Sequence, residues 1–339
     1  MLRTALKNPA LIAKDEAKHT WRVSSGSAGV LGMLEIRQDA PPTTAYLMLG
    51  ERCSRNCAFC TQARESRAQT AALSRVIWPG FPREEVIEAV GRAFREGKIV
   101  RACFQVTISR GYLEGAEKAI SELAQHCPVP ICASVVPRSP DDVAALLAAG
   151  AERVTIALDA ACERVYLETK SGSWTETIAL LELCAKLYPG RIGTHLIVGL
   201  GETEREIIER IQHMSDLGVS VGLFSFTPVS GTALAGRHPP ELGKYRRVQL
   251  ARWLVVNGLV RAEQFEYDEQ TEALSGYGLP VARLRVLLAD GEAFRTAGCP
   301  GCNRPYYNER PGGAMYNYPR PLTAEEAANE IGSLVRELS

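Results

Sequence analysis

Three cysteines lie close together in one short segment and have the clearest capacity for chemistry. Cys53, Cys57 and Cys60 have the spacing Cys-x-x-x-Cys-x-x-Cys and follow an apolar run at residues 45–49 that is typical of a strand. A loop this short can direct three thiolates at one centre. Three thiolates on a 4Fe–4S cube leave one iron without a protein ligand. We therefore expect an iron–sulfur cluster whose open iron binds another molecule.

Two other interpretations of these cysteines are open. A zinc site needs a fourth Cys or His ligand, and the nearest histidines in the chain are His19 and His126. Three unbound thiols in one loop would be hard to explain by packing alone. Both alternatives are weaker than the cluster, because clustered cysteines in a reducing compartment more often bind metal than form disulfides.

The cysteine spacing resembles that of the radical S-adenosylmethionine (SAM) superfamily, in which the open iron chelates the amino and carboxylate groups of SAM. Phe59 fits this resemblance, because members usually have an aromatic residue before the third cysteine. Residues 197–203, which include Gly199, Gly201 and Glu202, look like the segment that lines the adenine of SAM in biotin synthase and its relatives. Without the resemblance, the same residues predict a capped strand-to-helix turn.

Two further segments extend the resemblance. Residues 226–234 are similar to the Gly-Thr-Pro-Leu region that follows in the same family. Asp159 matches the second position of an Asn-x-Asp pattern of biotin synthase relatives, whereas Ala157 departs from the first. The resemblance implies that Asp159 contacts SAM hydroxyls, and the alternative is an N-cap for a helix starting at Ala160. No catalytic side chain is assigned.

Composition limits the class of protein. The chain has 339 residues, of which 46% are apolar and 23% charged, as in ordinary globular enzymes. Lys+Arg and Asp+Glu are both 39, so the chain lacks the excess of basic residues that would indicate nucleic-acid binding. No apolar run is long enough to cross a membrane, and residues 1–16 lack the apolar core of a signal peptide. We expect a cytoplasmic protein.

Strand-like and helix-like segments alternate after residue 44. The expected strands are residues 45–49, 100–108, 129–136, 153–158, 192–198 and 219–226, with a possible seventh at 262–267. The expected helices are residues 82–97, 113–126, 141–149, 175–187, 203–217, 241–257 and 323–338. This alternation predicts an α/β protein with a TIM-like (β/α) barrel, partial or complete, or alternatively a doubly wound open sheet. The cysteine loop would lie at the carboxyl ends of the strands.

Three regions are expected. Residues 1–44 form an N-terminal extension with a short helix at 8–18, and residues 45–290 form the barrel. Residues 291–339 form a tail, rich in Pro and Gly, that folds over the barrel mouth. Its polar and aromatic run at 304–310 is predicted to cap the cavity or bind a partner, or else to pack irregularly on the barrel bottom.

Four other cysteines suggest a second centre. Cys103 and Cys132 lie on the second and third expected strands, which are neighbours in a barrel, and Cys299 and Cys302 form a Cys-x-x-Cys pair in the tail. In biotin synthase, cysteines on these two strands bind an auxiliary cluster. Its third ligand corresponds to Gly193 here, and its arginine ligand has no clear counterpart. We expect the four thiols to hold an auxiliary cluster; a separate metal site or a redox dithiol in the tail is the alternative. Cys127, Cys162 and Cys184 are predicted to be structural.

The tail sequence at residues 299–311 resembles the biotin-synthase-like component of the two-protein lipoyl synthases of archaea and some bacteria. This implies that a 5′-deoxyadenosyl radical removes hydrogen from an octanoyl chain on a lipoyl carrier domain, and that the auxiliary cluster donates sulfur. Implied partners are the octanoylated carrier, a second radical SAM lipoyl synthase component, and a ferredoxin or flavodoxin; neither nucleic acid nor membrane is expected.

Three other functions are open for the same motifs. They are biotin-synthase-like sulfur insertion into another substrate, a radical SAM mutase or methyl-transfer-type enzyme with an electron-carrying second cluster, and a non-enzymatic iron–sulfur carrier.

Overall fold

The computed structural model describes residues 20–309 and 312–337. The helix expected at residues 8–18 and the tail residue Arg310 lie outside the described residues. None of the described helices is long and apolar enough to cross a bilayer.

Six parallel strands form the main sheet, and they follow one another in sequence order. They are β2 (Thr44–Leu49), β6 (Arg101–Val106), β7 (Ile131–Val135), β8 (Arg153–Ile156), β9 (Ile192–Val198) and β10 (Ser220–Ser225). Beyond β2 the sheet continues with β1 (Thr20–Val23), which is antiparallel to β2, and then with β5 (Gly80–Pro82), which is antiparallel to β1. Strand β10 is one edge of the sheet and β5 is the other. The prediction of an α/β protein with a mostly parallel sheet is confirmed, and the sheet is open.

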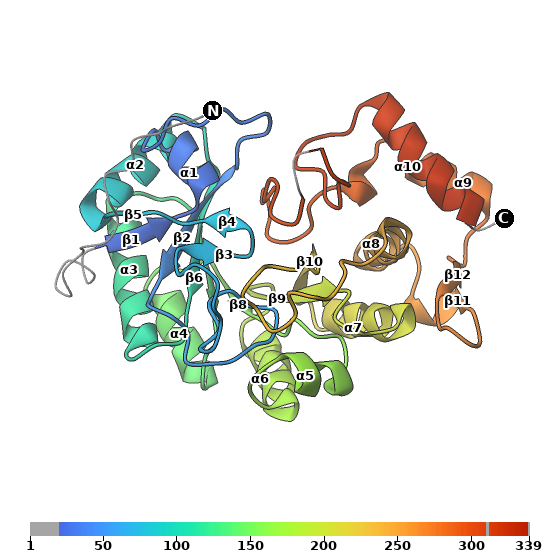
Figure 1. The fold of residues 1–339 in the computed structure, drawn as a ribbon, viewed down its shortest axis with the longest axis horizontal. Helices are drawn as coiled ribbons and strands as arrows, with labels where there is room; N and C mark the ends of the chain where they lie inside the picture. Colours follow the sequence, from blue (N-terminus) through green and yellow to red (C-terminus); the bar gives the residue numbers. More distant parts are fainter. Residues whose placement is uncertain (1–19, 310–311, 338–339) are drawn as a thin grey trace.

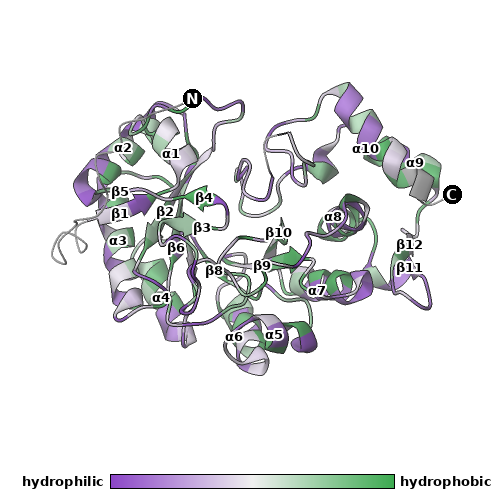
Figure 2. Cartoon of the chain, in the orientation of Figure 1, coloured by the Kyte–Doolittle hydropathy of each residue, from purple (hydrophilic) through white to green (hydrophobic). Residues whose placement is uncertain are grey.

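The strands consist mostly of apolar residues, as expected for strands whose outer face is covered by helices. All five residues of β7 are buried. The helices that follow the parallel strands lie around the outside of the sheet in Figure 1, and Figure 2 shows apolar residues along the strands and on one side of these helices. They are α2 (Arg83–Arg95), α3 (Tyr112–His126), α4 (Pro140–Ala148), α5 (Glu163–Thr169), α6 (Trp174–Leu187), α7 (Glu204–Asp216) and α8 (Leu242–Val256).

Helix α7 shows how the sequence sets these boundaries. Thr203 and Glu206 form a capping box at its start, with the Thr203 hydroxyl accepting the Glu206 backbone N–H. Ile207, Ile211 and Met214 then recur at helical spacing and are fully buried. The helix ends before Gly218, whose φ of 68° terminates the helical conformation.

The prediction of a possible seventh parallel strand at residues 262–267 is wrong. Residues 262–267 form a 3₁₀ turn, η2 (Ala262–Gln264), and a short strand, β11 (Glu266–Tyr267), which pairs with β12 (Leu274–Gly276) in a separate antiparallel sheet. A parallel strand is covered on both faces and needs a nearly continuous apolar run. This segment alternates charged and apolar residues, so it suits a half-exposed hairpin.

Several small elements were not anticipated. They are α1 (Ser25–Val30), β3 (Ala72–Leu73), β4 (Val76–Ile77), α9 (Val281–Leu287) and η3 (Glu292–Phe294). The closing helix α10 (Ala324–Glu337) was anticipated, and its Thr323–Glu326 cap is present. The division into regions at residues 44 and 290 stays a prediction, although β1 from the extension joins the main sheet.

The tail lies along the open side of the sheet instead of only over the mouth. Near its Cys-x-x-Cys turn, the Asn303 side chain accepts the backbone N–H of Thr43, just before β2, at 2.9 Å, and Arg101 at the start of β6 donates to the Pro300 carbonyl at 3.1 Å. Further on, Asn308 donates to the carbonyl of Ser225, at the carboxyl end of β10. The tail (red in Figure 1) therefore runs from the amino ends of the strands to their carboxyl ends.

Candidate functional site

A cavity of about 970 Å³ lies against the inner face of the sheet, and cysteines of both predicted clusters line it. Cys53, Cys57, Phe59 and Cys60 line it from the loop after β2. The remaining lining that concerns the predicted site consists of Asp159, Cys103, Cys299 and Cys302. Cys132 is buried behind the wall, against Cys299. The structure thus brings residues separated by about 250 positions to one cavity, as the sequence predicted for the cysteines.

The loop that carries the first three cysteines is fixed by its own backbone and by neighbouring segments. The Cys53 N–H donates to the Gln62 carbonyl at 2.9 Å, and the Ser54 N–H donates to the carbonyl of Ile108, after β6, at 2.7 Å. The Ala58 N–H donates to the carbonyl of Thr169 at the end of α5 at 2.8 Å. Because the backbone is held at three points, the three thiols are confined to one end of the cavity.

Burial raises the pKa of Cys57, and it raises the pKa of Cys60 to about 12. Among residues 20–309 and 312–337, no three His, Cys, Asp or Glu side chains already converge as a metal site. The donor chemistry nevertheless fits an iron–sulfur cluster. Three half-buried thiols from one loop face a shared cavity. The iron ions of a cluster would supply the positive charge that stabilises these thiols as thiolates.

The Arg52 side chain stabilises the cysteine loop through hydrogen bonds to its backbone. Its guanidinium donates to the carbonyls of Ala63, Ser66 and Ala68, all in the segment after the third cysteine. Replacing Arg52 by methionine leaves these carbonyls without their charged donor, so we expect the free energy of unfolding of the apoprotein to fall by about 2 kcal/mol. Urea denaturation measures this change.

A matched control for Arg52→Met is Arg64→Met, in the same loop. The Arg64 side chain is 63% exposed, and among the residues that the structure describes its ion pair is with the exposed Glu65, so its loss should change stability by less than about 0.5 kcal/mol. Equal losses in the two variants would contradict a bracing role for Arg52.

The segment after β10 packs against the same loop. Arg67 donates its backbone N–H to the Gly231 carbonyl at 2.8 Å, and the Ser66 hydroxyl donates to the same oxygen. Gly231 has a φ of 88°, and a Cβ there would lie 2.4 Å from the Ala68 nitrogen. Glycine is therefore required by this contact, and Thr227 of the same segment lines the cavity.

Asp159 faces the cavity and does not cap a helix. The next helix, α5, begins at Glu163 with Cys162 as its N-cap, so the capping alternative is wrong. Asp159 has a φ of 63°, and its carboxylate pairs with the Lys170 ammonium at 2.7 Å. Both side chains are mostly buried and line the cavity near Cys57. Such a pair can hydrogen-bond a polar ligand beside the thiols.

The turn at residues 199–203 is a capped strand-to-helix turn, as the alternative predicts, and its contact with SAM stays a prediction. Gly199, Gly201 and Glu202 do not line the cavity described above. The buried Glu202 carboxylate accepts the N–H groups of Gly199 and Leu200, at 2.7 and 2.9 Å, and so closes its own turn. A Cβ on Gly199 would meet Pro240 at 2.8 Å, so its close approach is to protein. Ile197 is the member of this segment that lines the cavity.

The second group of thiols comes together at the other end of the cavity. Cys103 and Cys132 are direct register partners on β6 and β7, so both point to the same face of the sheet. The Cys132 thiol donates to Cys299 at 3.2 Å, which lowers the pKa of Cys299 and raises that of Cys132. Cys302 lies 3.2 Å from the Tyr46 hydroxyl. Barrel and tail thiols are thus adjacent.

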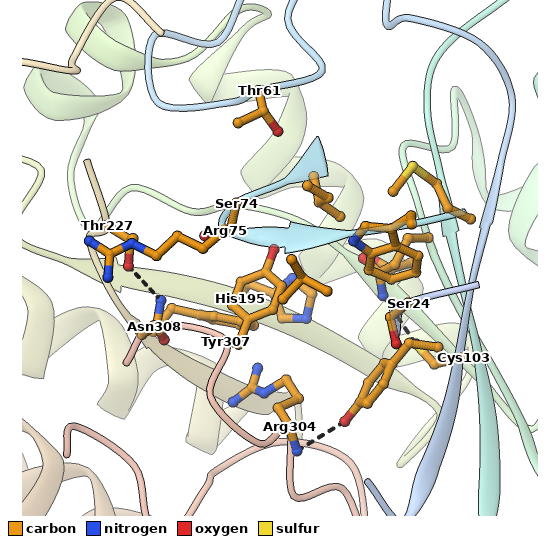
Figure 3. Close-up of a pocket in the computed structure, with 18 of the residues that line it drawn as sticks. Ser24, Thr61, Ser74, Arg75, Cys103, His195, Thr227, Arg304, Tyr307 and Asn308 are labelled. Atoms are coloured by element: carbon orange, nitrogen blue, oxygen red, sulfur yellow. Dashed lines mark hydrogen bonds between the residues drawn. The ribbon is translucent and has the colours of Figure 1, made fainter. Parts of the chain in front are cut away.

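Other side chains of the cavity were missed by sequence reasoning. Tyr46 lies on β2 in register with Cys103, and its position in a strand was the available signal. His195, from β9, packs edge-on against Phe224, and burial lowers its pKa to about 4, so it is neutral at pH 7. Arg304 and Tyr307 from the tail pack on the same Phe224 ring. Figure 3 shows His195, Arg304 and Tyr307 directed into the pocket.

The fold and the site together define a class of protein. Residues 47–214, about half of the chain, match the family described as the Radical SAM superfamily. The matched residues contain Cys53, Cys57 and Cys60 at its amino end and Asp159 and Ile197 further on. The family implies a 4Fe–4S cluster and SAM, and the three-thiol loop fits that cluster.

The similar curated proteins are distant relatives. They include a biotin synthase from Persephonella marina, 26% identical over 188 residues that cover 54% of this chain and 54% of that protein. A biotin synthase from Pelotomaculum thermopropionicum is 28% identical over 218 residues, 62% of this chain and 65% of its own. A lipoyl synthase from Halorubrum lacusprofundi is 21% identical over 192 residues, with coverage of 55% and 59%. The chain matches less than two thirds of each relative's length.

Solved structures support the fold assignment. The X-ray structure of the FeFe-hydrogenase maturase HydG from Carboxydothermus hydrogenoformans has a TM-score of 0.51 at 17% identity, covering 64% of this chain and 52% of that one. A crystal structure described as HydG, a maturase of the [FeFe]-hydrogenase, has a TM-score of 0.52 at 11% identity, covering 64% and 51%. At such identities the likeness concerns the fold alone, and it supports the partial barrel.

Proposed function

We propose that this protein is a radical SAM enzyme that inserts sulfur into an unactivated carbon, and that the four-thiol group of Cys103, Cys132, Cys299 and Cys302 holds the sulfur-donating auxiliary cluster. One observation carries the proposal. Thiols of two separate sets line one cavity, with Cys132 behind its wall against Cys299, and only the first set has the superfamily's spacing. A substrate in this cavity would lie between them.

The chemistry of hydrogen abstraction and sulfur donation belongs to the bound groups: SAM at the first cluster yields a 5′-deoxyadenosyl radical, and the second cluster supplies sulfur. The chain positions these groups and closes the cavity. Phe59, Ile197 and the Asp159–Lys170 pair line the end near the first cysteines and would contact SAM. The tail lies along the open side of the barrel, where it would limit the access of water to the cavity.

We propose an octanoyl chain on a lipoyl carrier domain as the substrate, with a second radical SAM component and a ferredoxin or flavodoxin as partners. The tail motif supports this choice, and a lipoyl synthase is among the distant relatives. Sulfur insertion into another substrate is the second candidate, because biotin synthases are also among these relatives.

The test uses anaerobically reconstituted protein with SAM, a chemical reductant and an octanoylated lipoyl-domain peptide. We expect methionine, 5′-deoxyadenosine and a peptide whose mass has increased by one sulfur, with or without the second component present. Cleavage of SAM with no added sulfur on any candidate substrate would favour a mutase or methyl-transfer-type enzyme. Absence of SAM cleavage under all conditions would favour an iron–sulfur carrier.

A further inference from the structure

Three arginine side chains gather around the second group of thiols. Arg101 is 4% exposed and donates from Nη1 to the Cys132 sulfur at 3.2 Å. Arg153 on β8 is the register partner of Cys132, so it lies on the same face of the sheet. Arg304 reaches the site from the tail, and its backbone N–H donates to the Tyr46 hydroxyl that contacts Cys302. All three positive charges act on Cys299.

These cations are not balanced by protein carboxylates. Within the described part of the chain, the ion pairs of this group consist of Arg101 with Glu152. The other partners are neutral: Arg153 donates to the Ser220 hydroxyl at 2.7 Å, and Arg304 donates to backbone carbonyls and stacks on Phe224. Two of the three guanidinium groups therefore lack a carboxylate in an ion pair, and the buried Glu309 offsets the charge of Arg304 only through a longer-range interaction. Positive charge in such a mostly buried setting is costly without an anion.

An unused donor points to the same missing anion. The Nε of Arg153 is buried and has no hydrogen-bond partner in residues 20–309 and 312–337. Buried donors are almost always satisfied in folded proteins, so an orphaned one needs an explanation. Arg101, in contrast, donates to Cys132, the Pro300 carbonyl and Glu152. Arg153 is therefore the member of this group with a hydrogen bond still to give.

Four cysteines binding an oxidised iron–sulfur core would supply the matching charge. Four thiolates outweigh a core of about +2, so such a centre carries a net charge of about −2. Four neutral thiols carry none. We propose that Arg101, Arg153 and Arg304 form a cationic cage for a dianionic centre at Cys103, Cys132, Cys299 and Cys302, and that Arg153 donates a hydrogen bond that raises its reduction potential. This inference rests on the proposed function, because it assigns residues to the auxiliary cluster.

The cage makes a redox prediction. A positive charge and a hydrogen bond near a cluster stabilise its reduced, more negative form. In reconstituted Arg153→Met protein we expect the equilibrium constant for reducing the second cluster to fall at least tenfold, which is about 59 mV for a one-electron step. Arg153→Lys should show a smaller fall, because it keeps the charge and loses the planar donor. An EPR-monitored redox titration measures both.

A matched control removes an arginine far from the thiols. Arg210 on α7 is half-buried against Trp174 and donates to the Ala161 carbonyl, so Arg210→Met should leave the potential unchanged. Iron and sulfide counts, with circular dichroism, show whether each variant still folds and holds both clusters.

The outcomes separate the two proposals. An unchanged potential in Arg153→Met, at full iron content, overturns the cage and leaves the proposed function standing. Loss of the second cluster in both Arg153 variants at native circular dichroism also overturns it, because the lysine retains the charge. Wild-type protein that holds only about four irons contradicts the proposed function and the cage together.

Discussion

Cys57→Ala protein is expected to lose reductive SAM cleavage completely, down to the rate measured without protein. Cys57 is one of three thiols that the loop after β2 presents to the cavity, and two remaining thiolates are too few to hold the cube with one open iron. Production of 5′-deoxyadenosine under dithionite is the measurement. The same loss is expected for alanine at Cys53 or Cys60.

The control for this prediction is Cys184→Ala. Cys184 is a fully buried thiol on α6, does not line the cavity, and packs in the hydrophobic core. Removing its sulfur leaves a small void, so stability falls slightly while cleavage continues. Cleavage that persists in Cys57→Ala at the wild-type rate would contradict the assignment of the three-thiol loop.

Replacing both Cys299 and Cys302 by serine is expected to separate the two centres. Iron content should fall from about eight to about four atoms per chain, as for the loss of one of two 4Fe–4S clusters. SAM cleavage should persist, because the first three thiols are untouched, whereas sulfur insertion should be lost. Iron analysis, the cleavage assay and product mass spectrometry measure the three effects.

The double serine variant changes the contacts of Cys299 with Cys132 and of Cys302 with Tyr46, but it leaves the hydrogen bonds of the neighbouring asparagines in place. The Asn303 contact to Thr43 and the Asn308 contact to Ser225 involve neither cysteine side chain. A Cys162→Ser/Cys184→Ser double variant, which removes two thiols outside the cavity, should retain all iron. Full iron in the Cys299/Cys302 variant would mean that the tail binds no cluster.

The grouping of the first three cysteines could be predicted because they are close together in the sequence. Cys53, Cys57 and Cys60 lie on one loop, so their proximity follows from local sequence. Cys103 and Cys132 required only that two successive strands be neighbours, which parallel βαβ units provide. The tail pair was harder, because contacts across more than 150 residues depend on the path of an irregular segment.

The errors have physical causes as well. For Glu202, the structure shows hydrogen bonds to the N–H groups of its own turn, and the contact of this turn with a ligand stays a prediction. The tail was expected over the barrel mouth. Its full path along the open side of the sheet could not be predicted, because the composition of an irregular segment does not specify its direction. Anchors at Thr43 and Arg101 place its cysteines near the amino ends of the strands. His195 and Tyr46 were not predicted, because a single polar residue within an apolar strand is only a weak signal of a functional site.

The most direct test of the central claim traces the sulfur. The second cluster is rebuilt anaerobically with sulfide of a heavy sulfur isotope, and a single turnover is run with SAM, reductant and the octanoylated carrier peptide. We expect a product that carries the heavy isotope, and no such product from the Cys299/Cys302 serine variant. A product with sulfur of natural isotopic composition, or a turned-over substrate without sulfur, would contradict it.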